Sequence, residues 1–133
     1  MVKYTKKEIY EFKNMTYIIY RIMNLINNKV YIGQTIKTFN GRYCGTKDMI
    51  AAERVLYSLE RSSENSGKSN HLLNSLRKYG AENFKVDILK RGLTREELNY
   101  WEEFYIALYN CTDQRYGYNY KKVGIIMSVS MII

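Results

Sequence analysis

The sequence has no proline, two cysteines and one histidine. Cys44 and Cys111 show neither CxxC nor Cys/His spacing, so the pattern predicts free thiols instead of a zinc site or a disulfide framework. No apolar run approaches the roughly 20 residues that a membrane helix needs, and charged residues stand where a signal peptide has its apolar core. These absences predict a protein of the cytoplasm or nucleus, neither secreted nor embedded in a membrane.

A basic charge balance is the first positive feature. The 133 residues carry a formal net charge of +8, and their number fits one domain with a modest core. An excess of Lys and Arg favours a polyanionic partner such as nucleic acid, although a merely soluble basic protein has the same composition. The charge alone therefore does not decide between these classes.

Residues 17–33 predict a β-hairpin on which the rest of the chain is organised. β-branched and aromatic residues flank a link, residues 24–28, that is rich in asparagine. If residues 24–27 form a four-residue loop, Tyr20 pairs with Tyr31 and their phenols share one face. Tyrosine is also an ordinary strand residue, so the pair by itself does not identify a site.

The elements expected after the hairpin complete an α+β domain, in which a small three-stranded antiparallel sheet is flanked by helices. Glycines make residues 34–45 a connection that ends near Arg42, and a three–four apolar spacing predicts a helix over 47–61. Residues 62–69 are small and polar and predict a loop. A helix over 71–79, a strand over 84–89 and a helix from the Thr94 capping box to about Tyr109 follow.

Glu102 departs from the pattern of the last helix. It projects at the edge of the apolar stripe, where a lone carboxylate is costly unless it is paired, protonated or bound to a cation. A structural salt bridge to an arginine and a metal site both satisfy this requirement, and the sequence leaves both open.

Five motifs, in order, make the chain resemble the GIY-YIG nuclease family over residues 17–119. The two parts of the name motif are present as residues 18–20, ending in Tyr20, and residues 31–33, beginning with Tyr31. Arg42 stands nine residues beyond Gly33, and residues 76–84 resemble the family's middle segment. Glu102 falls at the position of the family's metal-binding glutamate, and Asn119 ends the last motif.

The resemblance implies a metal-dependent DNA endonuclease that leaves 5′-phosphate and 3′-hydroxyl ends. By this analogy Glu102 binds one Mg²⁺ or Mn²⁺ ion, and Arg42 stabilises the charge of the transition state. Tyr20 would be the general base, which requires a lowered pKa, and Tyr31 would hold the water or phosphate in line. Asn119 would orient groups at the site.

Two positions depart from the family pattern. Ile18 replaces glycine in the first motif, and Thr46 stands where many members place a His or Tyr one helical turn after the arginine. Threonine can hydrogen-bond a phosphate but cannot shuttle a proton near neutral pH. Tyr43 or His71 are the candidates to replace it in an auxiliary role.

The expected organisation is a basic N-terminal arm (1–16), the nuclease-like domain (17–120) and an apolar C-terminal tail (121–133). DNA is the expected partner, with Lys29, Arg77 and Lys78 as DNA-binding residues. Target specificity is either low or supplied by a separate DNA-binding partner. The abundance of Lys, Asn, Tyr and Ile suggests an A·T-rich genome such as that of a phage or large virus. Homing, restriction, repair and mobile-element roles all remain open, with homing or mobile-element association expected from the resemblance. A non-catalytic DNA-binding or interaction module of the same fold, and a structural domain that associates through the tail, are the alternatives.

Overall fold

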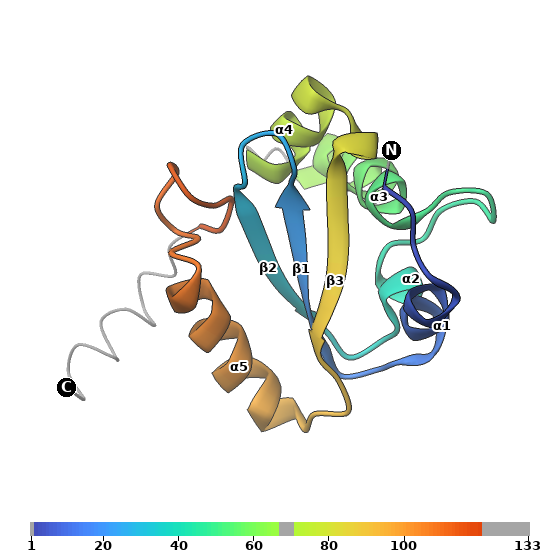
Figure 1. Ribbon diagram of the computed structural model, residues 1–133, viewed down its shortest axis with the longest axis vertical. Coiled ribbons are helices and arrows are strands. Elements are labelled where there is room, and N and C mark those ends of the chain that lie inside the picture. Colours follow the sequence, from blue (N-terminus) through green and yellow to red (C-terminus); the bar gives the residue numbers. More distant parts are fainter. Residues whose placement is uncertain (1, 67–70, 121–133) are drawn as a thin grey trace.

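The computed structural model describes residues 2–66 and 71–120, and these form an α+β domain (Figure 1). Its centre is an antiparallel three-stranded sheet of order β2-β1-β3, made of β1 (Ile18–Asn24), β2 (Val30–Thr35) and β3 (Phe84–Lys90). The predicted fold class is therefore confirmed. β1 lies between the other two strands, so the hairpin occupies both the centre and one edge of the sheet.

The hairpin register differs by two residues from the predicted one. Tyr20 pairs with Gly33, and Tyr31 pairs with Ile22. The Asn24 N–H donates to the Lys29 carbonyl (2.9 Å), so Asn24 still belongs to the strand. The loop therefore consists of residues 25–28, one residue later than predicted. A shift of two residues keeps every side chain on its face, so Tyr20 and Tyr31 still share one side of the sheet.

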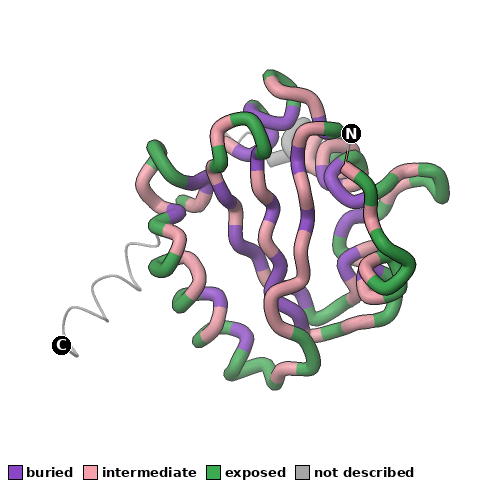
Figure 2. The backbone as a smooth tube through the Cα atoms, viewed as in Figure 1, coloured by how far each residue is buried: buried purple, intermediate pink, exposed green. Residues whose placement is uncertain are grey.

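Helices cover the two faces of the sheet unequally. The face that carries Tyr20 packs against α1 (Lys6–Asn14), α2 (Phe39–Arg42), α3 (Ala51–Ser66) and α4 (His71–Tyr79), through a core that includes Phe39, Val55 and Leu76. The opposite face packs against α5 (Arg95–Leu108) through Leu98. Buried positions recur along all three strands (Figure 2). The sheet is thus enclosed between two cores.

Local sequence explains most helix starts. Thr5 and Glu8 form a capping box at α1, and Thr94 and Glu97 form the predicted one at α5, with both reciprocal hydrogen bonds present in each. Gly80, with φ of 87°, ends α4 before a short 3₁₀ turn, η1 (Ala81–Asn83). Residues 1–16, the expected basic arm, include α1, whose Phe12 is buried in the core.

The third helix corrects two boundaries. α3 begins at Ala51, four residues later than expected, and runs to Ser66 through most of the segment predicted as a loop. Small polar residues disfavour a helix only weakly, and here the helix that begins at Ala51 continues through them to Ser66. Residues 67–70 and the apolar tail 121–133 lie outside the described residues. No described helix is long and apolar enough to span a membrane.

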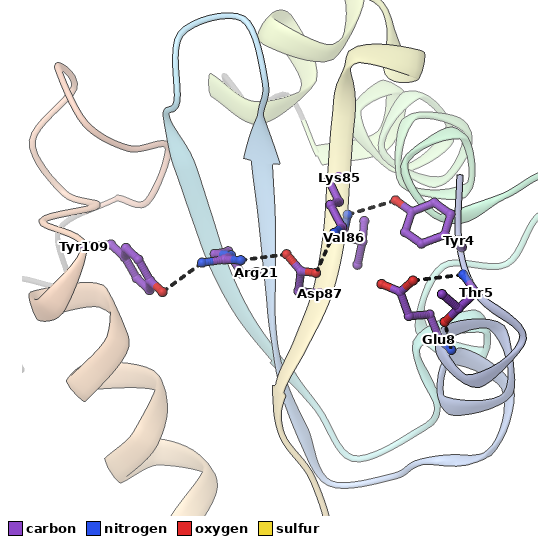
Figure 3. A network of polar contacts seen from close by, with 8 residues as sticks. All are labelled: Tyr4, Thr5, Glu8, Arg21, Lys85, Val86, Asp87 and Tyr109. Carbon is purple, nitrogen blue, oxygen red and sulfur yellow. Dashed lines mark hydrogen bonds and ion pairs between the residues drawn. The ribbon is translucent and has the colours of Figure 1, made fainter. Parts of the chain in front are cut away.

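Polar contacts tie the far end of α5 and the N-terminal segment to the sheet (Figure 3). Arg21 of β1 donates to Asp87 of β3 (2.7 Å) and to the Tyr109 hydroxyl just after α5 (2.9 Å). The Val86 N–H, on the outer edge of β3, donates to the Tyr4 hydroxyl (2.9 Å).

Residues 116–118 run beside the outer edge of β2. The Val30 N–H donates to the Tyr116 carbonyl (3.1 Å), and the Tyr118 N–H donates to the Val30 carbonyl (3.0 Å). The beginning of β2 is thereby covered by the last described segment. The strand continues past this cover toward Gln34.

Candidate active site

The buried phenol of Tyr20 is the centre of the candidate site. Its ring lies directly over Gly33, where any Cβ atom would overlap with the ring atoms. The ring centroid of Tyr31 is 6.4 Å away, and the hydroxyls of Tyr20 and Tyr43 are 2.7 Å apart and hydrogen-bonded. The first and second tyrosines of the name motif and Tyr43 therefore form one cluster of phenols.

A single helical turn positions Arg42 beside these phenols. The Thr38 hydroxyl caps α2 by accepting the Gly41 N–H (2.9 Å), and the buried Phe39 anchors the turn in the core. The guanidinium carbon of Arg42 lies 5.7 Å from the Tyr43 ring centroid. Arg42 itself is exposed and lines an open hollow of about 280 Å³ together with Gln34 and Lys37.

Glu102 reaches the same end of β2 from α5. Its side chain belongs to the buried class, with a residue exposure of 8%, because α5 packs along β2. Gln34 donates through Nε2 to Glu102 Oε1 (3.1 Å) and to Asn99 Oδ1 (2.9 Å). Since Gln34 also lines the hollow at Arg42, this amide connects the carboxylate to the arginine.

The donor set fits a hard divalent cation held by one carboxylate. Within residues 2–66 and 71–120, no three His, Cys, Asp or Glu side chains lie close enough together to hold a metal ion. These four residue types alone therefore do not form a metal cage in this part of the chain. Mg²⁺ commonly binds through one or two carboxylates and completes its shell with water and substrate phosphate oxygens, which Glu102 beside an open hollow can accommodate.

Burial dominates the electrostatics of the phenols. It raises the pKa of Tyr20 well above its ordinary value, and the neighbouring Tyr43 and Tyr31 raise that pKa further. Burial also raises the pKa of Tyr31, to which Tyr43 and the charge of Glu102 add. The charge of Arg42 opposes the shift at both Tyr20 and Tyr31. These phenols therefore keep their protons at neutral pH, so a base role for Tyr20 requires more positive charge beside it than Arg42 alone provides.

Asn119 is bound to the backbone of β2. Its Oδ1 accepts the Ile32 N–H (2.9 Å), and its Nδ2 donates to the Ile32 carbonyl (2.8 Å). The side-chain amide thus acts like one more residue of a β-ladder. Ile32 separates Tyr31 from Gly33, so Asn119 fixes the strand that carries the second half of the name motif.

The three auxiliary candidates lie in different places. Tyr43 belongs to the phenol cluster. His71 begins α4, and its ring packs 4.8 Å from that of Tyr120, near the far end of β1. Thr46 is exposed and lines a separate hollow of about 820 Å³ with Cys44 and Arg61. The structure therefore brings Tyr43 to Tyr20, and it does not bring Thr46 or His71 into the cluster.

The predicted DNA contacts also separate. Lys29 and Lys78 line one common hollow, whereas Arg77 forms an ion pair with Glu60 (3.2 Å) outside it. The sequence interpretation overlooked Gln34, although its position directly after Gly33 in the second name motif was a signal for it.

Comparisons with known proteins agree with this geometry. A family model described as "Putative endonuclease segE, GIY-YIG domain" matches residues 2–121. A mutant of the catalytic domain of the intron endonuclease I-TevI is 28% identical with a TM-score of 0.57, over 77% of this chain and 91% of that one. The catalytic domain of the homing endonuclease I-TevI is 26% identical with a TM-score of 0.51, over 82% of this chain and 100% of that one. No curated protein sequence matches the chain.

Proposed function

Because this chain belongs to the GIY-YIG endonuclease family and is a nuclease, we propose that it hydrolyses phosphodiester bonds of DNA in a divalent-metal-dependent reaction that leaves 5′-phosphate and 3′-hydroxyl ends. One observation carries the proposal. Glu102, Arg42 and the Tyr20–Tyr31 pair come from α5, α2 and the hairpin and meet around β2, where Gln34 links Glu102 to the hollow at Arg42 and both charges act on Tyr31.

Glu102 is the residue that would hold the cation, with Gln34 orienting its carboxylate through the Nε2 hydrogen bond. When bound, Mg²⁺ or Mn²⁺ supplies a Lewis acid for the phosphate and the leaving 3′ oxygen. Asn99 accepts the second N–H of the Gln34 amide, so the amide is held from two sides on α5. The carboxylate is thereby presented to the hollow in one orientation.

Arg42 binds the phosphate that is attacked. Its guanidinium is planar and always charged, and it can direct paired donors to the oxygens that gain charge in the transition state. The hollow that it lines with Gln34 and Lys37 is open, which suits a substrate as large as DNA. Lys37 adds a second positive charge at the same place.

The phenols position the attacking water. The protonated Tyr31 and Tyr20 can donate hydrogen bonds to the water or to a phosphate oxygen. Tyr20 takes the proton of the water only as a phenolate, which forms when the positive charges beside it outweigh its burial. Tyr43 is hydrogen-bonded to the Tyr20 hydroxyl and raises its pKa, so the charge that favours the phenolate has to come from Arg42 and the other cationic groups of the site.

Nicking of supercoiled plasmid tests the function. With Mg²⁺ or Mn²⁺ the wild type converts plasmid to the nicked form, and with a chelator it does not. Glu102→Gln and Arg42→Ala each lower the rate by about 100-fold or more, because each removes charge stabilisation from the transition state. Glu103→Gln is the matched control, since Glu103 is exposed on the next position of α5 and should retain the wild-type rate.

Metal binding provides an independent measurement for the same variants. Calorimetric titration with Mn²⁺ should show one site in the wild type and in Glu103→Gln and none in Glu102→Gln. Circular dichroism checks that all variants are folded. Undiminished nicking by Glu102→Gln would contradict the assignment of the metal site.

The second candidate function is a DNA-binding module without cleavage. It is favoured by the raised pKa of Tyr20 and by the two auxiliary candidates outside the phenol cluster, since Thr46 lines a separate hollow and His71 packs against Tyr120. Salt-sensitive binding of DNA by a folded wild type that nicks no plasmid with either metal would establish it.

A further inference from the structure

A second hollow, which we call the loop–helix hollow, opens between the β1–β2 loop, α4 and the segment after α5. Its volume is about 400 Å³. Lysine, amide and imidazole side chains dominate its walls: Asn27, Lys29, His71, Asn74, Lys78 and Gln114. None of the described residues that line it is an Asp or Glu. In a chain with 13 acidic residues, a hollow of this size without one favours an anionic occupant.

The floor of the loop–helix hollow is a buried hydrogen-bond cluster. The hydroxyls of Ser75 and Tyr118 are 2.6 Å apart, and Asn24 Nδ2 donates to the Tyr118 hydroxyl (3.1 Å). These three side chains come from α4, the C-terminal segment and β1. Hydrogen bonds between three different elements therefore hold the floor of the hollow in place, so its shape does not depend on a single loop.

Aromatic rings hold both lysines near the hollow. Lys29 Nζ lies 5.9 Å from the Tyr118 ring centroid, and Lys78 Nζ lies 5.2 Å from the Tyr79 ring centroid. Such placement restricts the long side chains and leaves the ammonium groups able to donate to another partner. Within the described part of the chain, neither lysine forms a salt bridge with a carboxylate.

The position of the hollow relates it to the cleavage site. Lys29 directly precedes β2, and Gln34 lies near the other end of that strand. Five residues of strand span about 17 Å, which matches roughly five base pairs at one phosphate per strand every ~3.4 Å of duplex axis. Tyr118, at the floor of the hollow, donates a backbone hydrogen bond to Val30 at the start of β2, and Gln34 lies four residues further along the same strand.

We propose that the loop–helix hollow binds the sugar-phosphate backbone of the DNA substrate about half a helical turn from the bond that is cleaved. Lys29 and Lys78 pair with phosphate, and the amides of Asn74 and Gln114 donate to phosphate or sugar oxygens. Contacts of this kind fix the register of the duplex without reading its sequence. The inference rests on the proposed nuclease function and adds to it a second anchoring point.

Two adjacent residues of α4 allow a matched test. Lys78 lines the hollow, whereas Arg77 is paired with Glu60 outside it, so Lys78→Gln and Arg77→Gln remove the same charge at neighbouring positions. Binding of a fluorescent 20-base-pair duplex is followed by anisotropy in chelator, which prevents cleavage. Lys29→Gln and Lys78→Gln should each weaken binding about fivefold and lower the slope of log affinity against log salt by about one.

Arg77→Gln should change the affinity less than twofold, and Lys78→Arg should restore it. In plasmid nicking, the Lys29→Gln/Lys78→Gln double variant should need more DNA for half-maximal rate, with the maximal rate unchanged. Equal weakening by Arg77→Gln and Lys78→Gln would overturn the inference, because binding would then follow net charge alone. Failure of the wild type to bind duplex or nick plasmid would overturn the proposed function, and the inference with it.

Discussion

At the scale of single residues, Gly33 shows why the second name motif ends in glycine. The ring of Tyr20 occupies the space in which a Cβ atom of Gly33 would lie, and the two residues face each other across the hairpin. Glycine is used here for the absence of a side chain, since Gly33 does not have a positive φ. The two halves of the name motif are therefore one packing unit.

Gly33→Ala should destabilise the protein by about 1–3 kcal/mol, because the added methyl group displaces the Tyr20 ring from a closely packed core. Urea unfolding measures the loss. The Gly33→Ala and Tyr20→Leu substitutions combined should cost less than the sum of their separate effects, since a smaller side chain at position 20 leaves room for the methyl group. Strictly additive effects would show that the two residues do not interact as described.

At this scale, the sequence identified the site residues that belong to a motif and missed the contacts that other residues make with them. Tyr20, Tyr31, Arg42 and Glu102 stand at motif positions, and the fold brings them together around β2. The hydrogen bond between the Tyr20 and Tyr43 hydroxyls and the one from Gln34 to Glu102 join residues 23 and 68 positions apart, and no local pattern encodes such pairs. His71 was weighed for its chemistry and Thr46 for its place four residues after Arg42, and neither joins the phenol cluster.

At the scale of elements, local signals with a fixed stereochemistry were the reliable ones. The Thr94 capping box marked the start of α5 because it satisfies two specific backbone N–H groups. The end of α3 was predicted wrongly because polar composition does not distinguish an exposed helix from a loop. The hairpin register was wrong by two because several asparagine positions can close the turn, and only the backbone hydrogen bonds select one.

Asn119 joins two elements, and its removal should loosen the end of β2. Asn119→Ala leaves the Ile32 N–H and carbonyl without their partners, at a cost of about 1–3 kcal/mol. Hydrogen exchange of the Ile32 amide should accelerate, whereas the Ile22 amide on the central strand β1 serves as the internal control. Unchanged exchange at Ile32 would show that the ladder-like pairing with Asn119 is not what protects it.

At the scale of the whole molecule, the buried phenols couple stability to alkaline pH. Burial raises the pKa of Tyr4 to about 12 and that of the Cys111 thiol to about 12, and it raises those of Tyr20 and Tyr31 as well. In the unfolded chain these groups lose their protons near pH 10 for Tyr and near pH 8.5 for Cys. The folded state therefore binds more protons than the unfolded state above those values.

Stability should accordingly be complete below about pH 8 and fall as the pH rises further. Each group contributes a loss of about 1.4 kcal/mol per pH unit between its unfolded and folded pKa. The urea midpoint measured from pH 7 to pH 11 should decline, and steeply above pH 10. Tyr4→Phe should make that decline shallower, because Tyr4 then has no proton to lose. A midpoint that is constant up to pH 11 would contradict the burial of these groups.

The two ends of the described chain also determine how the sheet meets other molecules. Tyr4 occupies a donor on the outer edge of β3, and residues 116–119 occupy the outer edge of β2 from Val30 to Ile32. Unpaired strand edges are the usual starting points for aggregation, because any extended chain can add to them. In this protein part of each outer edge is covered, by segments that are far apart in sequence. Loss of either segment would expose a template for intermolecular β-pairing as well as weaken the fold.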